Sequence, residues 1–234
     1  MDKDDQPLPS GPELMAQVQA QLPPMALQMN GFVRTRQKRQ QQDRRLVTVL
    51  RFGDPIPMAT YTLSDNFGEP ITQVQVSWLQ GQPHFQQWDA EGVALPVPSP
   101  EDEVIDTGLT WSDMSLDFLW WPGAKALERD IVKTRSSVVL EIEAPPGRDD
   151  VDMLKLWVDE RALFIVRAEF YDAEGELLRR IEVDKIKKVN EELWMVQDLM
   201  IYDRVNGRHI GIRFDEVIEL DEAVYVEPVM EEMP

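Results

Sequence analysis

Residues 152–220 read DMLKLWVDERALFIVRAEFYDAEGELLRRIEVDKIKKVNEELWMVQDLMIYDRVNGRHIGIRFDEVIEL. Apolar side chains recur at every second position over short runs of this stretch. Ile210, Ile212 and Phe214, for example, are each separated by one residue of another kind. A period of two over runs of this length is typical of a half-buried β-sheet. The stretch therefore predicts about five consecutive strands.

The links between these runs are short and have the composition of tight turns. The tetrapeptide Asp172–Gly175 suits a hairpin whose glycine takes the left-handed conformation, and Asp89–Gly92 repeats the same turn. Asn206 and Gly207 predict a two-residue turn with both residues at positive φ. Such short links force neighbouring strands to be antiparallel, because a parallel crossover needs a dozen or more residues.

The rest of the chain predicts more strands and two helical segments. A short helix is expected after residue 11, with Pro12 in its first turn. Alternating patterns predict further strands at residues 27–34, 46–52, 58–63, 71–79, 83–88 and 131–143. After Gly108 the period changes and indicates a helix with Ser112 as its cap, broken at Pro122-Gly123. One or two more helical turns are expected at residues 124–130.

Together these elements predict a mainly β protein. About eleven antiparallel strands must cover or close their edges, which a strongly curved, unclosed barrel achieves. The mid-chain helix is then placed to cover its open side as a lid. We expect a single β domain at residues 12–220, a disordered lead-in at residues 1–11 and a solvated acidic tail at residues 221–234.

Composition excludes several classes of function. The 234 residues carry a formal net charge of -19 and no cysteine. The missing thiols exclude disulfides and thiolate metal sites, and the negative charge disfavours nucleic acid as a partner. No G-x-S-x-G elbow, phosphate loop or dinucleotide fingerprint is present. We therefore expect a protein that is not an enzyme and has no cofactor and no metal.

Positive charge is concentrated in one segment, residues 34–51, which includes Arg39, Arg44 and Arg45. It is either the solvated tip of a hairpin or a docking site for an acidic partner or a lipid headgroup. The mid-chain helix also has two interpretations. Its apolar stripe of Leu116 and Leu119 with Trp120 fits core packing and the lining of an apolar pocket equally well.

Three segments resemble a known family. They are residues 108–114 (GLTWSDM), 154–159 (LKLWVD) and 168–172 (AEFYD). They are similar to the outer-membrane lipoprotein-sorting proteins, the LolA-like periplasmic lipoprotein carriers. The resemblance implies an unclosed antiparallel barrel of about eleven strands, covered by helices, with an apolar cavity. Members of the family carry the acyl chains of lipoproteins through the periplasm, and the same fold serves lipid binders and stress-sensing regulators.

The resemblance leads to specific expectations. The protein is expected to be a periplasmic monomer, after removal of a signal peptide, that binds lipoprotein acyl chains or another lipid reversibly and moves them toward the outer membrane. A membrane-bound lipoprotein-releasing transporter or an acceptor is a further expected partner. The alternative is a regulatory protein that senses lipid or lipoprotein. The expected cavity lining consists of Leu116, Leu119, Trp120, Leu156, Val166, Phe170, Ile181, Val183, Ile212 and Phe214, and the expected docking residues are Arg39, Arg44 and Arg45.

Overall fold

The computed structural model describes residues 7–190 and 193–220. Its strands are β1 (Leu27–Gln37), β2 (Gln40–Arg51), β3 (Met58–Ser64), β4 (Pro70–Leu79), β5 (Gln82–Asp89), β6 (Lys125–Val132), β7 (Arg135–Glu143), β8 (Met153–Asp159), β9 (Ile165–Tyr171), β10 (Leu177–Lys188), β11 (Trp194–Asp203) and β12 (Arg208–Glu219). The helices are α1 (Gly11–Gln19), α2 (Trp111–Ser115) and the 3₁₀ helix η2 (Asp117–Trp120). The tail at 221–234 and residues 1–6 of the expected lead-in lie outside the described residues.

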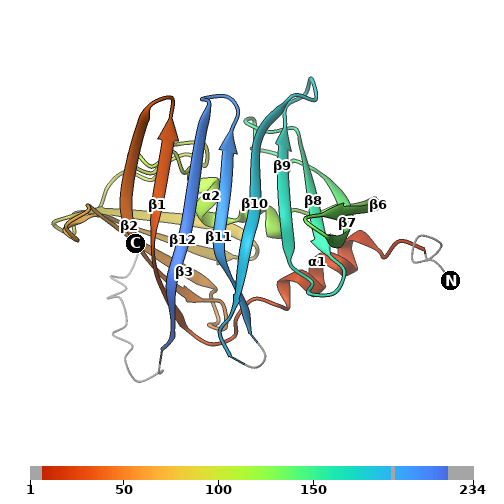
Figure 1. The fold of residues 1–234 in the computed structure, drawn as a ribbon, viewed down its shortest axis with the longest axis horizontal. Helices are drawn as coiled ribbons and strands as arrows, with labels where there is room; N and C mark the ends of the chain where they lie inside the picture. Colours follow the sequence, from red (N-terminus) through yellow and green to blue (C-terminus); the bar gives the residue numbers. More distant parts are fainter. Residues whose placement is uncertain (1–6, 191–192, 221–234) are drawn as a thin grey trace.

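All twelve strands belong to one antiparallel sheet, in the order β5-β4-β3-β2-β1-β12-β11-β10-β9-β8-β7-β6. The last strand, β12, pairs with the first, β1, and joins two meanders along one seam. Strands β5 and β6 form the two edges, so the described sheet is curved but not closed. The predicted fold class is therefore confirmed, and Figure 1 shows α2 behind the upright strands of this open half-barrel.

Turn chemistry explains why consecutive strands are neighbours. Gly175 has φ 81° and Gly92 has φ 80°, so the two Asp-x-x-Gly turns adopt the left-handed glycine predicted for them. The Asn206-Gly207 prediction is wrong in detail. Gly207 has φ 62°, but the link is a longer turn in which the Asp203 carboxylate accepts from the Asn206 backbone N–H at 3.0 Å.

The prediction of one or two helical turns at residues 124–130 is wrong, because this segment forms most of a strand. Lys125 pairs with Glu141 and starts the edge strand β6, which runs beside β7. Pairing with a formed strand satisfies the backbone groups that a short, isolated helical turn would leave open. The long link between β5 and β6, residues 90–124, crosses the concave side of the sheet and carries α2 and η2.

The core fills the concave side. Its fully buried side chains come from both meanders and include Leu27, Leu46, Leu63, Leu140, Leu154, Leu156 and Ile210. Burying each side chain of this size contributes roughly 1.5–3 kcal/mol. The α1 helix adds Leu14, Met15 and Val18 near β6. The core thus depends on the curvature that brings the two meanders and residues 90–124 together.

A second, small cluster lies apart from this core. Val132, Val139, Trp157 and Val166 are buried together, with Phe164 packed beside them. The turn that joins β6 to β7 reaches toward β10, where Lys133 forms ion pairs with Glu182 and Asp184. A groove of about 280 Å³ lies under this turn.

Candidate functional site: a lid across the half-barrel

Residues 110–121, the lid, cover the concave side of the sheet. The lid has two short pieces, α2 and η2, separated by Leu116, whose left-handed φ of 47° ends the first piece. Thr110 begins α2 by a reciprocal capping box. Its hydroxyl accepts from the Asp113 backbone N–H at 3.2 Å, and the Asp113 carboxylate accepts from the Thr110 backbone N–H at 2.7 Å. The expected cap, Ser112, instead lies inside the helix.

The lid packs on strands from both meanders. Tyr61 on β3 donates its hydroxyl proton to the Met114 carbonyl oxygen at 2.7 Å. Ring contacts with centroid separations of 5.1–5.7 Å join Trp111 to Phe85 on β5, Phe118 to Phe170 on β9 and Trp120 to Trp78 on β4. Aromatic pairs at such distances add stabilisation beyond the buried area. The lid therefore bridges the two halves of the sheet over their shared core.

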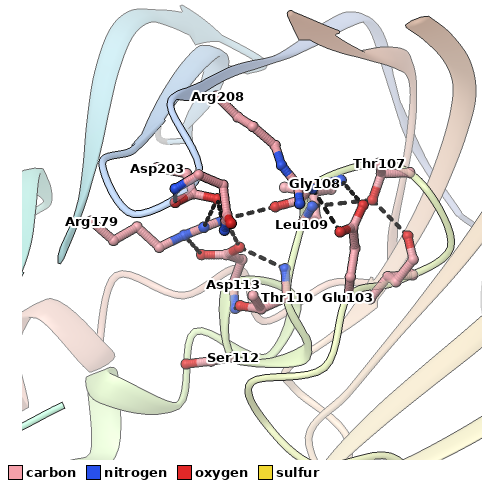
Figure 2. Close-up of polar contacts among 12 residues, drawn as sticks. Glu103, Thr107, Gly108, Leu109, Thr110, Ser112, Asp113, Arg179, Asp203 and Arg208 are labelled. Atoms are coloured by element: carbon pink, nitrogen blue, oxygen red, sulfur yellow. Dashed lines mark hydrogen bonds and ion pairs between the residues drawn. The ribbon is translucent and has the colours of Figure 1, made fainter. Parts of the chain in front are cut away.

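Arg179 on β10 holds the first end of the lid (Figure 2). Its guanidinium donates to Asp113, with Nε 2.8 Å from Oδ1, and to the Gly108 carbonyl oxygen at 3.0 Å. Asp203 on β11 lies 3.6 Å from the same guanidinium. The side chains of Asp113 and Asp203 are only 4% and 6% exposed. We call this group of Arg179, Asp113, Asp203 and Gly108 the Arg179 clamp.

A neighbouring ion pair supports the Arg179 clamp. Glu103 accepts from the Gly108 backbone N–H at 2.8 Å and from Arg208 on β12 at 2.6 Å. Arg44 on β2 pairs with Asp106 in the same loop at 2.8 Å. The loop before the lid is thus fastened to β2, β10 and β12 by charged contacts.

Arg148, in the loop between β7 and β8, holds the second end of the lid. It forms an ion pair with Asp117 in η2 and a two-point ion pair with Asp150, at 2.8 and 2.9 Å. Asp117 also accepts from the Ser112 hydroxyl at 2.9 Å and from the Trp121 indole N–H at 3.1 Å. We call Arg148, Asp117 and Asp150 the Arg148 clamp.

The charges of the Arg148 clamp shift its pKa values. Burial acts to lower the pKa of Arg148, but the hydrogen bonds and negative charges of Asp150 and Asp117 outweigh it and raise that pKa above its ordinary value. Burial likewise acts to raise the pKa of Asp150, and the hydrogen bond and charge of Arg148 lower it below the usual range. Both groups are therefore charged at neutral pH.

Most of the predicted lining residues surround the core beneath the lid. Leu119, Leu156, Phe170, Ile181 and Ile212 are buried in the core cluster, and Leu116, Trp120 and Phe214 pack against it. Their side chains pack together in one cluster. Two surface grooves in the described part of the chain, of about 280 and 300 Å³, are lined by residues outside the lid.

Val166 and Val183 occupy a different place from the other predicted lining residues. A register shift between β8 and β9 inserts Val166 as an extra residue, so it points into the small outer cluster while Ala168 and Phe170 point into the core. Val183 precedes a similar shift at Asp184 and borders the groove under the β6–β7 turn. Period-two alternation does not reveal a bulge, because one inserted residue reverses the faces that follow.

The predicted docking residues lie on the hairpin of β1 and β2, but in different environments. Arg39 is exposed at its turn, and Arg45 is exposed on β2. Arg44 is held by Asp106 on the side of the lid. Arg34 on β1 is also paired, with Asp43 at 2.7 Å.

Sequence reasoning missed both clamps. The T-x-x-D pattern of Thr110 and Asp113 was available as a capping signal, but the partner of Asp113 lies 66 residues away at Arg179. Arg148 stands in the loop between β7 and β8, 31 residues from Asp117, and only the fold brings the two together. Local patterns do not encode such long-range ion pairs.

None of the helices formed by residues 7–190 and 193–220 has the length and apolar character needed to span a membrane.

No curated protein matches the chain in sequence. The chain shares its fold with solved structures at low sequence identity. A DUF1329 family protein from Desulfovibrio piger has a TM-score of 0.78 at 16% identity, covering 91% of this chain and 94% of its own.

An outer membrane lipoprotein-sorting protein domain from Vibrio parahaemolyticus has a TM-score of 0.80 at 13% identity, with the same coverage of 91% and 94%. A LolA superfamily protein from Nitrosomonas europaea has a TM-score of 0.68 at 13% identity, covering 94% of this chain and 99% of its own. In sequence, a family model described as "Uncharacterized protein" matches residues 97–225, more than half of the chain. The chain therefore belongs to the family of that model, and it has the fold of the LolA superfamily and the outer membrane lipoprotein-sorting proteins.

Proposed function

We propose that this protein is a periplasmic carrier that binds acyl chains of lipoproteins, or another lipid, reversibly beneath the lid and moves them toward the outer membrane. The observation that carries the proposal is a lid whose inner side is apolar and whose two ends are held by ion pairs, Asp113 with Arg179 and Asp117 with Arg148. Packing and charge thus act on different parts of the same element. The fold shared with lipoprotein-sorting proteins supports the proposal.

In this mechanism the lid moves away and an acyl chain takes the place of its apolar side chains. Withdrawing each methylene from water contributes about 0.8 kcal/mol. Disrupting one buried ion pair costs up to about 3–5 kcal/mol, and less where water reaches the separated charges. About ten methylenes are then enough to offset the opening of both clamps. A long chain opens the lid, whereas a short chain does not, and reclosure of the clamps returns the cargo.

The hairpin of β1 and β2 is the proposed docking element for an acidic partner, such as a membrane-bound transporter or an acceptor. Arg39 and Arg45 stay exposed there while Arg44 is held by Asp106. In a chain of net charge -19, such exposed positive charge favours encounter with an acidic surface. We propose that the carrier acts as a monomer and by binding rather than by catalysis.

Dye displacement tests the carrier function. A naphthalene sulfonate dye should bind the native protein with micromolar affinity, and a long-chain fatty acid should displace it. Hydrogen exchange of the lid amides, such as the Met114 N–H bonded to the Thr110 carbonyl oxygen, should quicken when the fatty acid binds. A native protein that binds neither dye nor fatty acid would refute the proposal.

A further inference from the structure

Trp78 lies on β4 at the rim of the core, directly under the lid. The residue is 3% exposed, and its ring contacts two other aromatic rings. The Trp120 ring of the lid stacks on the Trp78 ring, with the two centroids 5.1 Å apart. The centroid of the Phe52 ring lies 5.4 Å from that of Trp78. The position is therefore an aromatic site that belongs partly to the sheet and partly to the lid.

The indole N–H of Trp78 is buried without a hydrogen-bond acceptor in the described part of the chain. Two other buried tryptophans show the usual arrangement. Trp121 donates to Asp117 at 3.1 Å, and Trp157 donates to Asp130 at 2.8 Å. A buried donor without a partner costs free energy, and native proteins satisfy nearly all such groups. The residues that the structure describes thus provide no acceptor for the Trp78 N–H while the lid is closed.

The neighbouring rings do not replace that acceptor. The Trp120 ring is inclined by only 30° to the Trp78 ring, so an N–H in the plane of Trp78 runs nearly parallel to the Trp120 face. The Phe52 ring is inclined by 43°. An N–H donor to an aromatic face requires an arrangement close to perpendicular.

Lid movement would open the space beside the Trp78 ring. Trp120 is the last residue of η2, and it rests against the turn between β4 and β5, where a Cβ on Gly81 would lie 3.4 Å from its side chain. Removing Trp120 opens one face of Trp78 to a ligand. The surroundings are apolar, so the ligand must be mainly hydrocarbon. Because an unpaired charge is costly to bury in apolar surroundings, a neutral acceptor oxygen fits this site better than a carboxylate.

We propose that the Trp78 indole N–H donates a hydrogen bond to the carbonyl oxygen of an acyl ester bound in the half-barrel, after Trp120 has moved aside with the lid. This inference rests on the proposed carrier function and adds the polar contact that sets how deep the acyl chain enters. It makes Trp78 a positioning residue for cargo that carries an ester next to its chain.

Two ligands of equal chain length isolate this contact: methyl dodecanoate, which has an ester carbonyl, and dodecyl methyl ether, which lacks it. Both are titrated against the bound dye. The wild-type protein should bind the ester roughly three- to tenfold more tightly, the range expected for one neutral hydrogen bond. Trp78→Phe keeps a ring but removes the donor, and its preference should fall to about one.

Thr48→Val is the matched control. Like the Trp78 N–H, the Thr48 hydroxyl on β2 is buried and has no hydrogen-bond partner among the residues that the structure describes. This variant should keep the wild-type preference for the ester. Independently of any variant, one tryptophan indole N–H signal of the isotope-labelled wild-type protein should move downfield with the ester and not with the ether.

A Trp78→Phe protein that retains the preference would overturn the proposal, as would a Thr48→Val protein that loses it. Equal binding of ester and ether by the wild-type protein, with no indole shift, would overturn the anchor and leave the carrier function standing. If neither ligand displaces the dye, the carrier function fails and the anchor fails with it.

Discussion

Asp113 and Arg179 form the contact that fixes the beginning of the lid to the sheet. The Asp113 carboxylate accepts from the backbone N–H of Thr110, the residue that caps α2, and, across the molecule, from the Arg179 guanidinium on β10. One carboxylate therefore both starts the lid helix and fastens it to the sheet. The lid cannot move away from β10 without exchanging these buried contacts for water.

Removal of the Arg179 guanidinium should loosen the lid and destabilise the fold. Arg179→Ala leaves Asp113 and Asp203 buried and unpaired, which costs about 3–5 kcal/mol. Urea unfolding measures this loss, and the dye should bind the folded variant more tightly than it binds the wild type. Arg213→Ala is the control, because Arg213 is half exposed and pairs with Asp215. That variant should lose at most about 1 kcal/mol, and an equal loss in both variants would contradict a specific role of Arg179.

The Arg148 clamp should weaken in acid. An aspartate in an unfolded chain titrates near pH 3.9, and Arg148 holds the pKa of Asp150 in the folded protein below its usual range. The folded state therefore binds fewer protons than the unfolded state between the two pKa values. The stability from Asp150 is fully present above about pH 5, begins to fall near the unfolded pKa of about 3.9 and is lost as the pH falls through the folded pKa.

Asp150→Asn isolates this effect. The difference in unfolding free energy between wild type and variant should be constant from neutral pH down to about pH 5 and should shrink in more acidic solution. Urea unfolding at a series of pH values provides the measurement. A difference that grows on acidification would show that Asp150 is not stabilised as a carboxylate by Arg148.

Cargo chain length should determine whether the lid opens. Because each methylene contributes about 0.8 kcal/mol, affinity should rise severalfold with each added methylene until the half-barrel is filled. Octanoate should fail to displace the dye under conditions in which hexadecanoate displaces it fully. Arg179→Ala should shift this threshold to shorter chains, since one clamp is already open. Equal displacement by both acids would contradict the balance between clamps and chain.

Substitutions of Arg39 and Arg44 should differ in their effect on stability, because only Arg44 is held by an ion pair with the loop before the lid. Arg39 is exposed at the hairpin turn, so Arg39→Glu should change the unfolding free energy by less than about 0.5 kcal/mol. Arg44→Glu loses its ion pair with Asp106 and faces that carboxylate with a like charge, so it should destabilise more. Thermal unfolding compares the two variants, and equal effects would show that Arg44 contributes nothing through Asp106.

The alternation of apolar residues was enough to predict the open antiparallel sheet, because each strand records in its sequence which side faces the core. Ile210 and Ile212 point inward as their spacing predicts. The lid was foreseen as one helix from its apolar stripe, but the left-handed Leu116 that divides it left no clear pattern. The partners of Asp113 and Asp117 follow from the curvature of the whole sheet, which no local stretch determines.

The bulge at Val166 separates the two sides of β9 and permits a direct test of which face holds cargo. Val166 is buried in the outer cluster, and Ile181 on the adjacent strand β10 is buried in the core under the lid. Val166→Ala and Ile181→Ala should both destabilise the protein by about 1–4 kcal/mol, because both leave a cavity. Only Ile181→Ala should also weaken fatty-acid binding, since it removes apolar surface from the chamber that the cargo enters. Fluorescence titration with the dye and a fatty acid measures both affinities in the folded variants. Loss of affinity in Val166→Ala, with Ile181→Ala unaffected, would place the cargo on the outer face and contradict binding beneath the lid.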